Sequence, residues 1–182
     1  MRSRALTLIA AASMLAVGLV APTAAATPSS SPALNATIAA TSATSSRDKV
    51  TSNKKKHKKI EKHVVRLVNK ARTKAGLDKV KRRAAITKVA RKWSVEQAKR
   101  GQLAHNPSFG SQLPSGWTRA SENVAWTSAN MSAKKLAKRM VQLWLDSPGH
   151  RANILDPHMS TTGVGVARSK RHGWYFTQNF SG

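Results

Sequence analysis

The spacing of apolar residues changes along this chain, and the change limits the possible folds more than any other feature. Between residues 60 and 144, large apolar side chains recur three or four positions apart, which is the period of amphipathic helices. Near the C-terminus, residues 163–167 and 174–180 are instead rich in β-branched and aromatic side chains, which predicts two strands joined by a basic turn. Helices followed by a small terminal sheet indicate an α+β fold.

The helical part divides into three main segments. The first is expected to begin near Ile60, the second to span residues 84–100, and the third to follow Ser132, a typical N-cap residue. A further helical turn is expected at residues 150–155, after a Pro-Gly pair that we expect to end the third helix.

The N-terminus has the layout of an export signal. A short basic head precedes an apolar run over residues 5–21, and small residues follow as far as Ala26. This order is typical of a secretory signal peptide, so we expect residues 1–26 to be cleaved. The alternative is an uncleaved signal anchor, because the apolar run is about long enough to span a membrane. Either way the sequence predicts export, to the extracellular space or to the cell wall.

The segment that follows has a composition unlike that of a folded domain. Residues 27–53 are rich in Ser, Thr, Ala and Pro, and residues 54–59 are almost all lysine. Such a segment buries too little apolar surface to offset its chain entropy, so we expect a disordered linker over residues 27–59 and a domain over 60–182. The lysine run has two interpretations, a solvated extension of the first helix or an electrostatic contact with a polyanion.

The charge of the chain indicates its partners. The sequence holds 32 Lys and Arg against 7 Asp and Glu, a formal net charge of +25. We therefore expect binding to cell-envelope polyanions or anionic lipid. Export and the lack of a stacked-aromatic motif argue against nucleic acid. The chain has no cysteine, which excludes disulfides and thiolate metal sites. We expect it to be monomeric.

Three residues of the expected domain are candidates for a functional site. They are His105 in LAHN, Glu122 in SENVA and His150 in SPGH, each in or beside a loop next to a regular element. Two imidazoles and a carboxylate can bind a divalent metal or transfer protons near neutral pH. Their spacing does not show that they share a site. Separate surface or capping roles are the alternative.

Six motifs taken together resemble a known family. The chain contains, in order, GLDKV, RGQLAHN, SENVA, QLWLDSPGHRANIL, GVGVA and WYFTQNF. This series resembles the CAP superfamily of cysteine-rich secretory, antigen 5 and pathogenesis-related proteins, and is similar to its bacterial secreted branch. The resemblance covers residues 60–182. It implies an α-β-α sandwich with a small antiparallel sheet and a central cleft.

The resemblance also implies a set of cleft residues. Members of the family commonly have two histidines and two acidic residues in the cleft, and His105, Glu122 and His150 match three of them. The fourth position falls on Ser147, with Asp146 beside it. The sequence establishes no cofactor; zinc or another divalent cation is the candidate, which His105 and His150 with Glu122 would hold. A missing carboxylate leaves more of the coordination to water.

Two functions are consistent with these features. The first is a secreted CAP-domain protein that binds a lipid, peptide or envelope glycan in its cleft and anionic surfaces through its charge. The alternative is a metal-assisted hydrolase, in which His105 and His150 hold zinc and Glu122 orients or deprotonates a water. The same three residues are then the catalytic candidates.

Overall fold

Helix α1 (Lys54–Lys74) begins earlier than expected. The computed structural model describes residues 53–182, and Asn53 caps α1 by accepting a hydrogen bond from the backbone N–H of Lys56. Residues 54–59, which we expected to belong to the linker, therefore form the first turns of this helix. Lysine is a good helix former, so a lysine run next to a capping residue can extend a helix without apolar positions of its own. The predicted signal peptide and the rest of the predicted linker lie outside the described residues.

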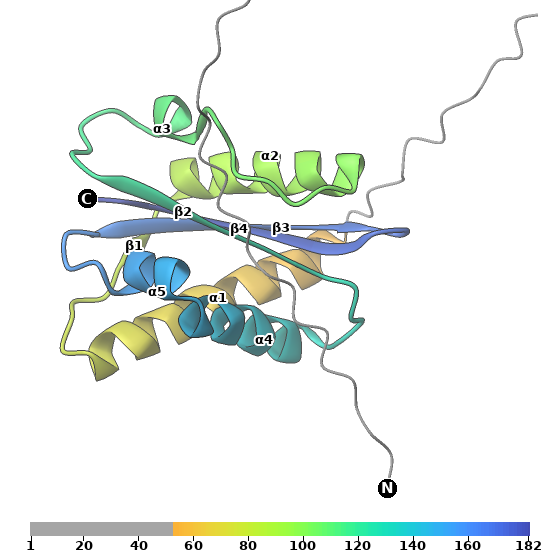
Figure 1. Ribbon diagram of the computed structural model, residues 1–182, viewed down its shortest axis with the longest axis horizontal. Helices are drawn as coiled ribbons and strands as arrows, with labels where there is room; N and C mark the ends of the chain where they lie inside the picture. Colours follow the sequence, from red (N-terminus) through yellow and green to blue (C-terminus); the bar gives the residue numbers. More distant parts are fainter. Residues whose placement is uncertain (1–52) are drawn as a thin grey trace, which may run out of the picture. The chain divides into compact units, whose positions relative to one another are not determined.

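The helices form two layers with a sheet between them (Figure 1). Helix α2 (Ala84–Arg100) covers one face of the sheet, and α1, α4 (Ala133–Asp146) and α5 (Pro148–Leu155) cover the other. A short helix, α3 (Phe109–Gln112), lies in the connection that follows α2. The expected α+β sandwich is confirmed. In the described part of the chain, no helix has the length and apolar character needed to cross a membrane.

The sheet has four strands in the order β1-β3-β4-β2. They are β1 (Lys81–Arg82), β2 (Ala120–Thr127), β3 (Thr161–Ser169) and β4 (Gly173–Ser181). Strand β4 pairs with β2 and β3 in antiparallel fashion, whereas β1 is parallel to β3. The sheet is thus mixed rather than purely antiparallel. Strand β1 is short and charged, so the apolar pattern gave no sign of it.

Helix α2 lies very close to β3 because two positions of that strand are glycine. A Cβ atom added to Gly163 would lie 2.3 Å from the backbone of Ile86, and one added to Gly165 would lie 2.2 Å from the backbone of Ala90. Real Cβ atoms do not approach backbone atoms so closely. The two glycines therefore set the distance between helix and sheet.

The main hydrophobic core lies on the other face, between the sheet and the layer of α1, α4 and α5. Its largest fully buried aromatic side chains are those of Trp144, Trp174, Phe176 and Phe180. Ser132 caps α4 as expected, accepting a hydrogen bond from the backbone N–H of Lys135 at 3.4 Å.

A buried arginine joins α1 to the segment between α5 and β3. The Arg72 residue is 0% exposed, and its Nη1 donates to the carbonyls of Ile154 and Asp156, both at 2.8 Å. Its Nη2 donates to the carbonyl of Met159 at 3.1 Å. These bonds fix the end of α5 and, with it, one wall of the site described next.

Candidate functional site

Glu122 is the centre of the candidate site. It lies on β2, an edge strand of the sheet, and its side chain is only 2% exposed. Its Oε1 accepts the backbone N–H of Asn106 at 2.9 Å and lies 2.9 Å from Nδ1 of His105. A single carboxylate oxygen thus fastens the loop after α2 to strand β2.

The contact with Glu122 changes the acidity of His105. The hydrogen bond to the carboxylate is the main reason that the pKa of His105 is raised above its ordinary value; burial acts in the opposite direction, and the negative charge of Glu122 adds to the rise. The protonated imidazole and the carboxylate therefore stabilise each other. Since Nδ1 of His105 faces Glu122, Nε2 is the ring nitrogen left for a ligand.

His150 is held by a hydroxyl rather than a carboxylate. Its Nδ1 lies 3.0 Å from Oγ of Ser147. Burial is the main cause that lowers the pKa of His150, and the positive charge of His105 lowers it further. Helix α5 is joined to strand β2 beside Glu122, because Nδ2 of Asn153 donates to the carbonyl of Glu122 at 3.3 Å. Asp146 does not supply the missing carboxylate, because it is exposed and its Oδ1 accepts from Nε2 of Gln142 at 2.8 Å.

The local backbone around His150 differs from our expectation. Helix α4 ends at Asp146, and Pro148 is the first residue of α5 rather than part of a turn. Proline is favoured at this position because its missing N–H would have no partner in the helix anyway. His150 accordingly projects from the first turn of α5 and not from a loop.

Three asparagines complete the frame, and none of them was among the predicted site residues. Asn106 binds Glu122 through its backbone, as described above. Nδ2 of Asn123 donates to the carbonyl of His150 at 3.2 Å, and Nδ2 of Asn153 donates to Oδ1 of Asn123 at 2.8 Å. Asn106 and Asn123 directly follow His105 and Glu122 in the sequence, and Asn153 lies three positions after His150. This proximity to the predicted residues was the one available signal.

The loop after α2, strand β2 and helix α5 therefore meet at the edge of the sheet. His105 contacts Glu122 directly, Ser147 contacts His150, and the two histidines interact through their charges. All four predicted site residues lie in this neighbourhood. The central cleft itself stays a prediction.

The arrangement does not fit the expected three-ligand metal site. Among residues 53–182, no group of three or more His, Asp and Glu side chains is placed to hold a metal ion. Oε1 of Glu122 already accepts two hydrogen bonds, and both Nδ1 atoms face Glu122 or Ser147. Two Nε2 atoms remain, with the buried Oε2 of Glu122, which has no partner in the described structure.

Comparison with known proteins identifies the family. The family model described as the cysteine-rich secretory protein family, CAP, matches residues 65–180. The chain belongs to this family. As a CAP protein it is 33% identical over 129 residues to the uncharacterized protein YkwD of Bacillus subtilis (strain 168), an alignment that covers 67% of this chain and 47% of YkwD.

Solved structures resemble the chain as well. An extracellular protein containing a SCP domain from Bacillus anthracis is 26% identical, with a TM-score of 0.57, and the match covers 69% of this chain and 41% of that protein. An outer surface protein from Borrelia burgdorferi has a TM-score of 0.60 at 16% identity, covering 74% of this chain and 97% of that one. This second likeness concerns the fold alone. The chain spans less than half the length of the two Bacillus proteins.

Proposed function

We propose that this chain is an exported bacterial CAP-domain protein that binds a ligand at His105, Glu122 and His150 without turning it over. The ligand classes are those named above, a lipid, a peptide or an envelope glycan. We also propose that it binds anionic surfaces through its positive charge. The Bacillus anthracis relative, which is named as extracellular, supports export, and the net charge of +25 supports the anionic partner.

The observation that carries this proposal is the pair of opposite pKa shifts around one buried carboxylate. The pKa of His105 is raised and that of His150 is lowered. The imidazole of His105 therefore holds a proton more readily than that of His150, so His105 favours the role of a charged donor and His150 that of a neutral imidazole. Such a pair suits a ligand that presents an anionic or carbonyl oxygen to His105 and a hydroxyl or amide to His150.

Binding is favoured over catalysis by the residue at position 147. Two titratable groups whose pKa values are pushed apart are also what acid–base catalysis needs. Here Ser147 occupies the position of the second carboxylate, and Oε1 of Glu122 is committed to two donors. For these reasons the metal-assisted hydrolase is the second candidate.

The experiment follows the two imidazoles directly. We would record the histidine ring resonances by NMR while adding palmitate, a short peptide or a soluble envelope glycan fragment. One probe should shift the signals of His105 and His150, leave the exposed His158 unchanged, and be recovered intact. If no probe moves either signal, or if the probe is cleaved, ligand binding without turnover is wrong.

Metal analysis separates the second candidate. Stoichiometric zinc in the purified protein, lost in His105→Ala, would favour the hydrolase over our proposal. Negligible zinc in both proteins would rule the zinc hydrolase out.

A further inference from the structure

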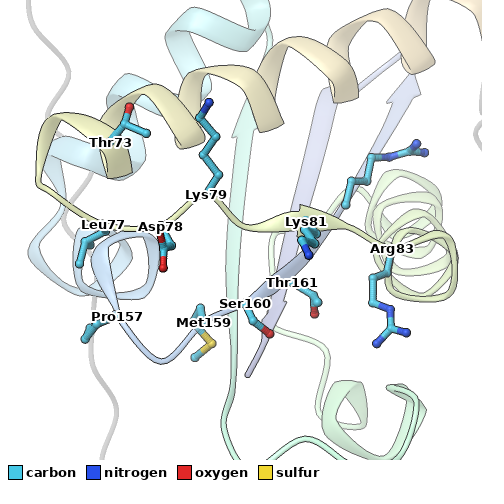
Figure 2. A pocket seen from close by; sticks show the side chains of 11 residues that line it. Thr73, Leu77, Asp78, Lys79, Lys81, Arg83, Pro157, Met159, Ser160 and Thr161 are labelled. Atoms are coloured by element: carbon cyan, nitrogen blue, oxygen red, sulfur yellow. The ribbon is translucent and has the colours of Figure 1, made fainter.

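Three adjoining hollows lie around β1, the edge strand opposite to β2, and the smallest of them extends across the end of the sheet to residues 114–117. The largest hollow, about 950 Å³, lies around β1 and is lined by side chains from residues 73–83 and 157–161 (Figure 2). A second hollow of about 430 Å³ shares Thr73 and Lys79 with the first. A third of about 90 Å³ shares Arg83, Ser160 and Thr161. We call this row of hollows the β1 groove.

The β1 groove is strongly basic. Six cationic side chains and one carboxylate line it: Arg66, Lys70, Lys79, Lys81, Arg82 and Arg83, with Asp78. In the part of the chain that the structure describes, only Arg82 of these cations has a carboxylate within ion-pair distance, Glu61 at 4.0 Å. That carboxylate is bound more closely by Arg91, at 2.5 Å. Most of the positive charge of the groove is therefore not compensated.

The backbone that carries these cations is held firmly. The N–H of Lys81 donates to the carbonyl of Ser160 at 2.8 Å, and the N–H of Arg83 donates to the carbonyl of Thr162 at 2.9 Å. Between Lys79 and Lys81, the side chain of Val80 is buried at 2% exposure. Figure 2 shows Lys79 and Arg83 extending to opposite sides of this segment. Charges on a fixed backbone lose less entropy when an anion binds.

Protection of the sheet edge explains only part of this pattern. Charged side chains on an edge strand discourage pairing with other chains, and Lys81 and Arg82 of β1 would serve that purpose. Arg66 and Lys70, however, come from α1, which is no part of the sheet, and they line the adjoining hollow. The cationic side chains therefore lie along the whole groove and are not confined to the edge strand.

We propose that the β1 groove binds a polymer of repeating phosphate groups. Lysine and arginine are the usual phosphate-binding side chains, and a row of hollows suits successive groups of a chain better than one small anion. An anionic membrane would instead need apolar side chains that project from the surface. In the largest hollow, Met159 is 3% exposed and Leu77 is partly buried. The exposed Trp117 lines only the smallest hollow. The inference rests on the anion-binding part of the proposed function and is independent of the His105 site.

The test compares two variants with the same loss of charge. The groove variant carries Lys79→Gln, Lys81→Gln and Arg83→Gln. The control carries Lys134→Gln, Lys138→Gln and Arg139→Gln, all exposed on α4. The probe is long-chain inorganic polyphosphate, with binding followed by fluorescence anisotropy of labelled probe over a range of salt concentrations.

The two variants should behave differently. At about 0.15 M salt the groove variant should bind polyphosphate about tenfold or more weakly. The slope of log K against log salt should fall by about 2, because each of the three lost phosphate contacts removes about 0.7 of a unit on a single-stranded polyanion. The control should stay within about twofold of the wild type. The single substitution Lys81→Gln, at an exposed position, should lower polyphosphate affinity in the same way but by less. It tests the proposal even if the triple variant does not fold.

Other outcomes would overturn the inference in distinguishable ways. An equal loss of polyphosphate affinity in both triple variants would mean that net charge alone determines binding. The groove would then not be the binding site, although the protein would still bind anions. Tighter binding to phosphatidylglycerol vesicles or polyglutamate than to polyphosphate would contradict a phosphate polymer. A wild type that binds none of these probes would overturn anion binding altogether. Glu122→Gln should leave polyphosphate affinity unchanged; a loss there would contradict a site separate from His105.

Discussion

The Oγ atom of Ser147 lies 3.0 Å from Nδ1 of His150, so a hydroxyl orients this imidazole as the carboxylate of Glu122 orients that of His105. The two histidines are held in the same way by groups of different charge. This difference accounts in part for the opposite shifts of their pKa values, since only His105 has a negative partner.

The first prediction concerns the partner of His150, which is changed from a hydroxyl to a carboxylate. Ser147→Asp should raise the pKa of His150 by about 1 unit or more, because an adjacent negative charge favours the imidazolium. NMR titration of the His150 ring measures the change. Asp146→Asn is the matched control and should leave this pKa unchanged, since Asp146 binds Gln142. A fall or no change in Ser147→Asp would contradict the role of the Ser147 contact.

The second prediction concerns the approach of α2 to the sheet. Gly165→Ala should lower the free energy of unfolding by about 3 kcal/mol, because its Cβ would meet the backbone of Ala90. A Cβ added at Gly149, in helix α5, would meet no atom within 4 Å. Gly149→Ala should therefore be neutral or stabilising by up to about 1 kcal/mol. Urea unfolding measures both, and equal effects would show that the contact with α2 does not matter.

The third prediction tests the buried guanidinium. Arg72→Lys should destabilise the domain by about 3 kcal/mol or more, because one ammonium cannot reach the separate carbonyls of Ile154, Asp156 and Met159. The exposed Arg66 lies on the same helix, and Arg66→Lys should cost less than about 0.5 kcal/mol. Chemical denaturation compares the two. Similar small losses would mean that Arg72 does not fasten α5.

The fourth prediction gives a pH dependence of stability. His57 packs edge-on against Trp174 with ring centroids 5.6 Å apart, and burial is the main cause that lowers its pKa below the ordinary 6.5. The unfolded chain then binds this proton more readily, so the contribution of His57 to stability is present above about pH 6.5 and is lost as the pH falls. His57→Phe should remove this loss.

The measurement is the free energy of unfolding at about pH 7 and about pH 5 in wild type and variant. The variant should lose less stability on acidification than the wild type, while His158→Gln, at an exposed position, should behave like the wild type. A variant that becomes more sensitive to acid would contradict the burial of His57.

The sequence predicted α1, α2, α4, α5 and the two C-terminal strands, because their apolar spacing is explicit, but it predicted neither the short α3 nor strand β2. It could not predict β1, whose two charged residues form a strand only by pairing with Thr161 and Thr162 of β3. It also took Pro148 as the end of one helix, although the residue begins the next. Proline is compatible with both positions, so the pattern alone could not decide.

The site depended on contacts that spacing does not encode. His105 and Glu122 are 17 positions apart, and Asn153 and Asn123 are 30 apart, so only the fold brings them together. The motif order singled out His105, Glu122 and His150, which stay predicted site residues, but it could not show that Oε1 of Glu122 accepts from two donors or that Asp146 binds Gln142. Spacing also could not show that no three His, Asp and Glu side chains of residues 53–182 are grouped to hold a metal ion.

The most direct test is an NMR titration of the His105 and His150 rings in the wild-type protein. The pKa of His105 should lie above 6.5 and that of His150 below it, and Glu122→Gln should lower the first toward the ordinary value. If both rings titrate together near 6.5, or in the reverse order, the two imidazoles do not share a site organised by Glu122.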